Sequence, residues 1–214
     1  MSKSPKQVLI VFLKYPEPGR VKTRLARDIG WKNASLIYSE IAQSVIGKVS
    51  KSSEYETLIF FDPPEKKEDV RRWLKNANLN LLPQEGNPLG ERMLNAFEKA
   101  FSLGAKSAVI IGTDCMEVSD KTVLEAFQAL REVDAVLGPA RDGGYYLLGL
   151  NRALPWIFKD IKWSTSLVLS QTIKKIEEKK LRFKLLKTLT DIDTVRDLSK
   201  ELLLKVKEDK KWTL

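Results

Sequence analysis

Four cationic side chains gather early in the sequence, around the segment Pro16–Arg24 (PEPGRVKTR). Such charges repel one another unless an anion lies among them, and a helix start behind the segment would add unpaired N–H donors. The segment therefore predicts a phosphate-binding loop, to which Gly19 and Thr23 also belong. The alternative is a solvated basic loop stiffened by proline and glycine. The four cations are Lys14, Arg20, Lys22 and Arg24.

Two familiar nucleotide-binding fingerprints are absent from this loop. The sequence has no G-x-G-x-x-G, and the glycine that a G-x-x-x-x-G-K-[ST] loop requires does not precede Lys22 and Thr23. A Rossmann dinucleotide site and a P-loop nucleotide triphosphatase are therefore disfavoured.

Candidate carboxylates lie at two other places in the sequence. Asp114 (GTDC) comes after a continuous apolar stretch, and at the carboxyl end of a buried strand its charge is costly unless a cation or hydrogen-bond donors meet it. A metal is the simplest partner, and a helix cap or a salt bridge is the alternative. Asp191 and Asp193 (DID) leave the same face of an extended segment. One of them could bind a metal while the other caps or orients the helix that begins at Thr194.

A glycine-rich segment, GPARDGGYY, lies between two expected strands. Gly143 and Gly144 either form a simple turn or let a bulky ligand approach the backbone closely. Asp142 is then available for a hydroxyl, an amine or a proton. Tyr145 and Tyr146 alternate along the next strand, so one is expected to face the ligand crevice and the other the core.

Composition limits the chemistry further. The chain has no histidine, which excludes a Ser-His-Asp triad and imidazole metal sites, so a metal would be held by oxygen ligands, as Mg²⁺ or Mn²⁺ is. The single cysteine, Cys115, excludes disulfides within the chain and zinc sites of several thiolates. The net charge of +9 suits small polyanionic substrates better than nucleic acid, because no aromatic-basic motif accompanies the lysines.

Strands alternate with helices along the chain, which predicts an α/β sandwich with a mostly parallel sheet in one domain, residues 1–214. Ligands of such sheets bind at the carboxyl ends of the strands, where the four segments fall. No apolar run approaches 18 residues, so we expect a cytoplasmic protein without a membrane segment. The expected strands are Val8–Leu13, Thr57–Phe61, Leu79–Leu82, Ser107–Ile111, Ala135–Leu137, Tyr145–Leu150 and Phe183–Leu186. The expected helices are Asn33–Val49, one ending near Asn76, Leu89–Leu103, Asp120–Arg131, Ser164–Lys180, capped by Trp163–Ser166, and Thr194–Val206.

Strings spread over nearly the whole chain resemble a bacterial family of small glycosyltransferase-like proteins, the arsenosugar-biosynthesis or radical-SAM/selenodomain-associated transferases. These strings are KYPEPGRVKTRLA, LGERM, IGTDC, LGPARDGGYYLLGL, WSTS and DIDTVRDL. The resemblance implies a GT-A nucleotide-diphospho-sugar transferase fold, a three-layer α/β/α sandwich shared with molybdopterin and phospholactate guanylyltransferases.

The same resemblance implies roles for particular residues. The four cations would hold nucleotide phosphates, Asp114 and Asp193 would be the metal ligands, and Arg92 would face the pocket or the surface. The chain departs from its relatives at Met116, where many have proline, and in lacking the glycine-rich first loop of the guanylyltransferases.

These expectations amount to a metal-dependent transferase that moves a sugar from a nucleotide-sugar donor to a small-molecule acceptor, with Asp142 orienting or deprotonating the acceptor. A nucleotidyltransferase that joins an NTP to a phosphorylated small molecule and releases pyrophosphate needs the same groups. A non-catalytic nucleotide-binding protein and a nucleic-acid binder are the remaining classes, and homodimer formation is left open.

Overall fold

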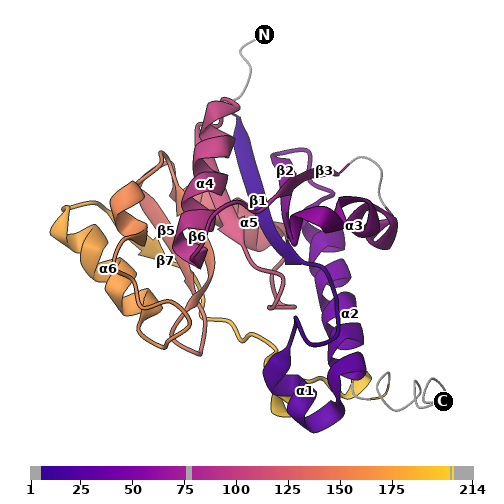
Figure 1. The fold of residues 1–214 in the computed structure, drawn as a ribbon. Coiled ribbons are helices and arrows are strands. Elements are labelled where there is room, and N and C mark those ends of the chain that lie inside the picture. Colours follow the sequence, from indigo (N-terminus) through magenta and orange to yellow (C-terminus); the bar gives the residue numbers. More distant parts are fainter. Residues whose placement is uncertain (1–5, 76–78, 203, 205–214) are drawn as a thin grey trace.

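The computed structural model describes residues 6–75, 79–202 and 204. Its seven-stranded sheet has the order β3-β2-β1-β4-β6-β5-β7 (Figure 1). Strand β6 runs antiparallel to β4 and β5, and the other neighbouring pairs are parallel, so the sheet is mixed and mostly parallel. The strands are β1 (Gln7–Lys14), β2 (Glu56–Asp62), β3 (Asn80–Pro83), β4 (Ser107–Ile111), β5 (Ala135–Pro139), β6 (Tyr145–Leu150) and β7 (Phe183–Leu185).

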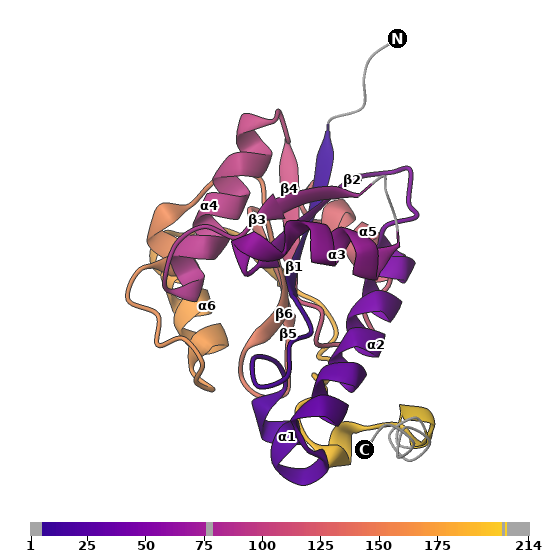
Figure 2. The ribbon, with the colours of Figure 1, turned by 45° about the vertical axis from the view of Figure 1, so that its right-hand side comes forward.

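Helices cover both faces of the sheet. Figure 2 shows α2, α3 and α5 on one side and α4 and α6 on the other, which confirms the predicted three-layer α/β/α architecture. Within the described ranges no helix has the length and apolarity needed to cross a membrane. The helices are α1 (Thr23–Ile29), α2 (Trp31–Val49), α3 (Lys67–Leu74), α4 (Leu89–Ser102), α5 (Asp120–Ala129) and α6 (Val168–Glu178), with 3₁₀ turns η1 (Pro64–Lys66), η2 (Pro155–Phe158) and η3 (Val195–Asp197).

The continuous apolar strands follow from this layering. Leu9 and Val11 pack into the core under α2 and α5, whereas Val8 and Ile10 pack into the core under α4 and η2. Successive side chains of a strand point to opposite faces, so a strand covered on both faces is apolar at every position. Because β1 and β4 lie at the centre of the sheet, their carboxyl ends place the loops that follow them in the middle of one edge.

The helix predicted from Ser164 starts later than expected. Residue Ser164 has a φ of 61°, outside the right-handed helical region, and α6 begins only at Val168, with Leu167 as an N-cap that makes no side-chain hydrogen bond. The expected cap is therefore wrong. The indole of Trp163 instead packs on α4, where a Cβ added to Gly90 would lie 2.6 Å from the ring.

The helix predicted from Thr194 is also wrong at its start. A 3₁₀ turn, η3, follows Thr194, and its capping box pairs the Thr194 hydroxyl with the Asp197 carboxylate at 2.8 Å. Leu198 is then extended and buried, which carries the chain back to the core, and helical backbone resumes only at Lys200. Of the remainder of the predicted helix, residues 203, 205 and 206 lie outside the described part of the chain.

Candidate functional site

The four segments singled out in the sequence meet at the carboxyl ends of β1, β4, β5 and β7. The backbone N–H of Ile192 donates to the carbonyl of Asp114 at 3.0 Å, which joins the DID segment to the GTDC segment. The N–H of Arg141 donates to the carbonyl of Leu189 at 3.1 Å, which joins the glycine-rich segment to the same stretch. In Figure 1 the chain after β7 crosses from the sheet to α1, beside the basic loop.

Lys22 lies at the centre of this meeting point. Its ammonium forms an ion pair with Asp114 and lies 3.3 Å from Oδ1 of Asp193. The Lys22 side chain is only 3% exposed, whereas those of Asp114 and Asp193 are 49% and 37% exposed. The two carboxylates that the resemblance makes metal ligands thus share one cation of the protein itself.

Backbone and electrostatics both hold Lys22 in this position. With φ 47° and ψ 48°, Lys22 is the left-handed N-cap residue of α1, a conformation that is uncommon outside glycine. Burial by itself would lower the pKa of Lys22, but the charges of Asp114 and Asp193 outweigh burial and raise that pKa above its usual value. The side chain is therefore a permanent cation at neutral pH.

Asp191 is a site residue to which the family resemblance gives no role, although its spacing from Asp193 marks it as a candidate. Burial, followed by repulsion from Asp114 and Asp142, raises the pKa of Asp191 to about 7. Perturbed carboxyl groups of this kind cluster at functional sites. The D-x-D spacing was the available signal, because it places both carboxylates on one face, but only the fold shows how much Asp191 is buried.

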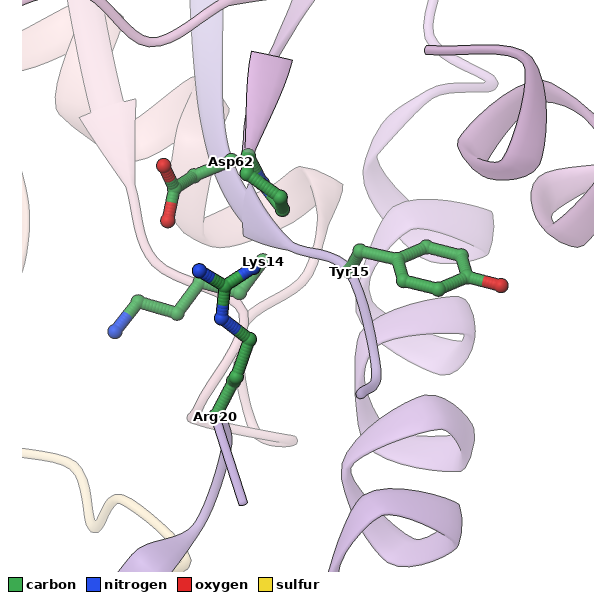
Figure 3. Close-up of a pocket in the computed structure, with 5 residues that line it drawn as sticks. Lys14, Tyr15, Arg20 and Asp62 are labelled. Atoms are coloured by element: carbon green, nitrogen blue, oxygen red, sulfur yellow. The ribbon is translucent and has the colours of Figure 1, made fainter. Parts of the chain in front are cut away.

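Lys22, Asp114 and Asp193 form a carboxylate cluster. A separate pocket of about 230 Å³ is lined by Lys14, Tyr15, Arg20, Asp62 and Pro63. Figure 3 shows the charged ends of three of these side chains, two cations and the Asp62 carboxylate, gathered on one side, while the ring of Tyr15 turns away from them. The four predicted phosphate ligands therefore divide into two pairs.

One pair, Lys14 and Arg20, lines the pocket, and Arg20 also pairs with Glu17 at 3.2 Å. The other pair, Lys22 and Arg24, contacts Asp193, although Arg24 is 65% exposed and its Nη1 lies 3.5 Å from the carboxylate. Both Gly19 and Thr23, the remaining predicted members of the loop, are exposed.

Two residues that the sequence did not indicate tie the strand ends together. The backbone N–H of Lys14 donates to the Tyr38 hydroxyl at 2.9 Å, and that hydroxyl lies 3.0 Å from Oγ1 of Thr113. The Gln84 amide, which is buried, donates to the carbonyls of Leu13 (3.2 Å) and Phe60 (2.9 Å). These bonds fix the ends of β1 and β2, from which the pocket residues project.

Arg92 contacts the pocket through Asp62, one of the residues that line it. Its Nε donates to the carbonyl of Gly86 at 2.9 Å, and its Nη1 lies 3.5 Å from both the Gln84 side-chain oxygen and Oδ1 of Asp62. Arg92 thus orients Asp62, a wall residue of the pocket. Asp62 itself follows an apolar strand as Asp114 does, so the rule that selected Asp114 could have found it.

Gly143, in the glycine-rich segment, packs against the backbone of Ser166 and does not border open space. With φ +88°, a Cβ there would lie 2.2 Å from the backbone oxygen of Ser166, and the N–H of Leu169 donates to the Gly143 carbonyl at 2.9 Å. The N–H of Gly144 donates to Oδ1 of Asp142 at 2.8 Å, which fixes the exposed Asp142 carboxylate on its own turn.

The two tyrosines after this turn are both engaged with protein groups. Tyr146 is buried, and its hydroxyl donates to the carbonyl of Lys187 at 3.1 Å. The Tyr145 hydroxyl lies 3.9 Å from Sδ of Met93, and burial raises the pKa of Tyr145 well above its usual value, so it stays protonated. Contact of Tyr145 with a substrate stays a prediction.

The donor set of the cluster suits a hard cation. Asp114 and Asp193 both direct an oxygen at one point, and the ammonium of Lys22 stands there as an internal cation. In residues 6–75, 79–202 and 204, no group of three or more acidic or cysteine side chains is arranged to hold a metal. Mg²⁺ is commonly bound through one or two carboxylates plus substrate phosphates and water, so two carboxylates fit such an ion if Lys22 moves.

Comparison with known families gives one match. The matching family is DUF2064, described as an uncharacterized protein conserved in bacteria. The match spans residues 45–165, which include β2 to β6. No curated protein matches the chain.

Solved structures share the whole fold. A protein from Desulfovibrio desulfuricans G20, provisionally identified as a nucleotide-diphospho-sugar transferase, is 31% identical with a TM-score of 0.88, and the match covers 97% of this chain and 96% of that one. A 4-diphosphocytidyl-2C-methyl-D-erythritol synthase from Anaerococcus prevotii DSM 20548 is 12% identical with a TM-score of 0.61, covering 96% and 99%. An inositol-1-phosphate CTP transferase from T. maritima is 11% identical with a TM-score of 0.57, covering 97% and 98%. The likeness to the last two shows the fold alone.

Proposed function

The chain belongs to the bacterial family DUF2064, and from this membership and the geometry of the site we propose that it is a transferase acting on a nucleotide-sugar donor. The 31% identical structure from D. desulfuricans, itself provisionally a nucleotide-diphospho-sugar transferase, supports the donor class. The narrower assignment to the arsenosugar-biosynthesis or radical-SAM/selenodomain-associated type rests on the sequence strings alone and stays a prediction.

One observation carries the proposal. The end of β1 and the loop that follows it supply cations both to an open pocket, through Lys14 and Arg20, and to a carboxylate pair, through Lys22 and Arg24. A nucleotide sugar has a diphosphate that needs cations and a leaving group whose negative charge grows during transfer. The loop presents its cations where the diphosphate of a donor seated at the strand ends would lie.

The roles of the residues follow from this arrangement. Lys14 and Arg20 bind the donor phosphates, and Asp62, held by Arg92, accepts a hydrogen bond from a hydroxyl or an amine of the donor. Asp114 and Asp193 are the residues that would hold Mg²⁺ or Mn²⁺. When bound, such an ion supplies Lewis-acid stabilisation of the leaving phosphate.

The acceptor is a small molecule with a nucleophilic hydroxyl. Asp142 is proposed to orient or deprotonate it, because this carboxylate is exposed, is fixed by Gly144, and lies close enough to Asp191 for the two charges to repel. Gly143 and Gly144 set the course of this turn, and Tyr145 follows it at the start of β6.

Nucleotidyl transfer is the alternative and would use the same residues. In that reaction a substrate phosphate attacks the α-phosphorus of an NTP, and pyrophosphate leaves into the cationic pocket. The solved structures that share the fold include a CTP transferase and a synthetase complexed with CTP, so NTP binding must be tested beside nucleotide-sugar binding.

Thermal unfolding with a panel of nucleotide sugars and NTPs, each with Mn²⁺, Mg²⁺ or EDTA, tests the proposal. A nucleotide sugar with metal is expected to raise Tm by about 5 °C or more at saturation, because it binds only the native state. The free NTP is expected to give a smaller shift. A shift for an NTP and none for any nucleotide sugar would select nucleotidyl transfer instead.

Variants show whether the assigned residues carry the response. Lys14→Met is expected to remove most of the nucleotide-dependent shift, whereas Arg27→Met is expected to keep it, because Arg27 is exposed on α1 and takes no part in the pocket. Asp114→Asn is expected to abolish the metal-dependent part. Wild-type shifts in both site variants would show that the donor binds elsewhere.

A further inference from the structure

Lys22 differs from the other three cations of its loop. Its ammonium lies between two carboxylates, and its side chain is almost fully buried although the carboxylates themselves are half exposed. Lys14, Arg20 and Arg24 are exposed. The left-handed backbone that turns Lys22 inward is unfavourable outside glycine, and a lysine that served only to bind phosphate would not need it.

The position of the ammonium is also the position that a metal would need. Oδ1 of Asp114 and Oδ1 of Asp193 both contact Nζ of Lys22. Mg²⁺ sits about 2.0–2.1 Å from its oxygen ligands, so an ion held by both carboxylates would overlap the ammonium and be repelled by its charge. The two cations exclude each other.

We propose that Lys22 is an internal competitor of the divalent cation: it neutralises Asp114 and Asp193 in the metal-free protein and must leave them before they can bind Mg²⁺ or Mn²⁺. The inference rests on the proposed function, because the metal is part of that proposal. It adds that metal affinity without donor is weakened by the protein's own lysine.

The donor gives the displaced ammonium a new partner. Lys22 is two residues from Arg20, which lines the pocket proposed for the donor phosphates. A diphosphate there would attract a released Lys22, and the two carboxylates would then accept the metal. Donor and metal are therefore expected to bind with positive cooperativity, because each favours the arrangement in which Lys22 has left the carboxylates.

Binding of Mn²⁺ without nucleotide tests the inference directly. The full-length wild-type protein and its variants are titrated with Mn²⁺, and the unbound ion is measured by its electron paramagnetic resonance signal. Removing the positive charge that occupies the position of the ion is expected to tighten Mn²⁺ binding by about tenfold or more in Lys22→Met. Asp114→Asn combined with Lys22→Met is expected to lose this gain.

Arg24→Met is the matched control, because it removes one positive charge that also contacts Asp193 but is 65% exposed. It is expected to change Mn²⁺ affinity by no more than about threefold, since exposed charges are screened. An equal gain in both variants would mean that only net charge matters, and would overturn the inference. An unchanged or weaker affinity in Lys22→Met would overturn it as well.

Two further measurements complete the test. Circular dichroism establishes that Lys22→Met is folded, and Lys22→Gln, which retains a polar tip, replaces it if it is not. The proposed function is judged separately by the nucleotide-dependent Tm shift of the wild-type protein. A metal-dependent shift with a nucleotide sugar, beside equal Mn²⁺ affinities, would refute the competition and leave the transferase proposal standing.

Discussion

At the scale of single residues, the site is a set of charges balanced against burial. Lys22 remains charged because Asp114 and Asp193 offset the cost of burying it. Burial and the charges of Asp114 and Asp142 instead raise the pKa of Asp191 to about 7. Cys115, next to Asp114, is buried as well. The raised pKa values of Asp191 and Cys115 each lead to a measurable prediction.

The first prediction concerns Asp191 and the stability of the metal-free protein. The pKa of Asp191 is about 7 in the folded state and about 3.9 in the unfolded chain, so the native state binds more protons between these values. Stability should therefore fall as pH rises from about 4 to about 7 and level off above. Asp191→Asn should raise the free energy of unfolding at pH 8 by about 2 kcal/mol, allowing for partial solvent screening.

Urea denaturation in EDTA, at pH 5 and pH 8, measures this effect. The exposed Asp28 of α1 serves as the control, since Asp28→Asn should change stability little at either pH. A destabilised Asp191→Asn at pH 8 would contradict the prediction and indicate that the charged carboxylate is needed for folding.

The second prediction concerns the thiol. Burial is the main cause that raises the pKa of Cys115 to about 11. At pH 8 the thiolate fraction should then be about a hundredfold lower than for an ordinary cysteine, and access is blocked as well. Ellman's reagent should leave the native protein unmodified over hours and react fully once guanidinium unfolds it. Rapid labelling of the folded protein would show that the GTDC loop opens.

At the scale of elements, the loops at the strand ends are positioned by close packing between segments. The turn after β5 rests on the segment before α6, with Gly143 against Ser166, and Trp163 of that segment rests on Gly90 of α4. Alternate strand residues anchor the sheet to its helices on both faces. The rim of the site is thus fixed by close contacts at glycines, where a larger side chain would collide with its neighbour.

The third prediction uses two glycines with the same backbone angle. Gly19 and Gly143 both have φ +88°, but a Cβ on Gly19 meets nothing within 4 Å, whereas a Cβ on Gly143 would lie 2.2 Å from the Ser166 backbone. Alanine at Gly19 should cost about 1 kcal/mol for the left-handed conformation alone. Alanine at Gly143 should cost about 3 kcal/mol or more, because backbone must also shift.

Guanidinium denaturation of both variants measures the difference, which isolates the steric part from the conformational part. Similar losses of stability in the two variants would mean that the Gly143 turn can move away from Ser166 without cost. In that case the turn would be adaptable rather than fixed.

At the scale of the whole molecule, the net charge of +9 is distributed so that some cations serve the site and many others lie on helix surfaces. Ion pairs such as Arg71 with Glu68 and Lys174 with Glu178 are typical of a solvated helix face. The charge therefore favours anionic ligands generally, and only the pocket and the carboxylate cluster give it a place for a particular one.

The fourth prediction separates the two kinds of anion binding by salt. Affinity for an arbitrary DNA duplex should fall by about a thousandfold or more between about 50 and 200 mM salt, because it depends on released counterions. The Tm shift caused by a nucleotide sugar with Mn²⁺ should persist over the same range, since buried and partly buried charges are screened less. Fluorescence anisotropy and thermal unfolding measure the two responses. Steeply salt-dependent binding of DNA beside no Tm shift with any nucleotide would revive the nucleic-acid interpretation.

The architecture and the candidate segments could be predicted from the amino-acid pattern alone. Apolar segments separated by helical patterns predicted the seven strands, and all seven are present. The signal is strongest for the central strands, because burial on both faces requires continuous apolar runs there. The position of each segment after a strand then predicted that all four would meet. The helix starts predicted at Ser164 and Thr194 were wrong. Trp163 packs on Gly90 of α4 and Leu198 is buried in the core, and such tertiary contacts leave no signal in the local sequence periodicity.

The pairing of the charges in the site, in contrast, depends on the three-dimensional fold. Lys22 and Asp193 are 171 positions apart, and no spacing in the sequence could join them or show that Asp191 is buried. The basic loop looked like four equal phosphate ligands, yet the fold turns one of them inward onto two carboxylates. Residue types record which charges are available, whereas their burial and partners arise only when distant strand ends are brought to one edge of the sheet.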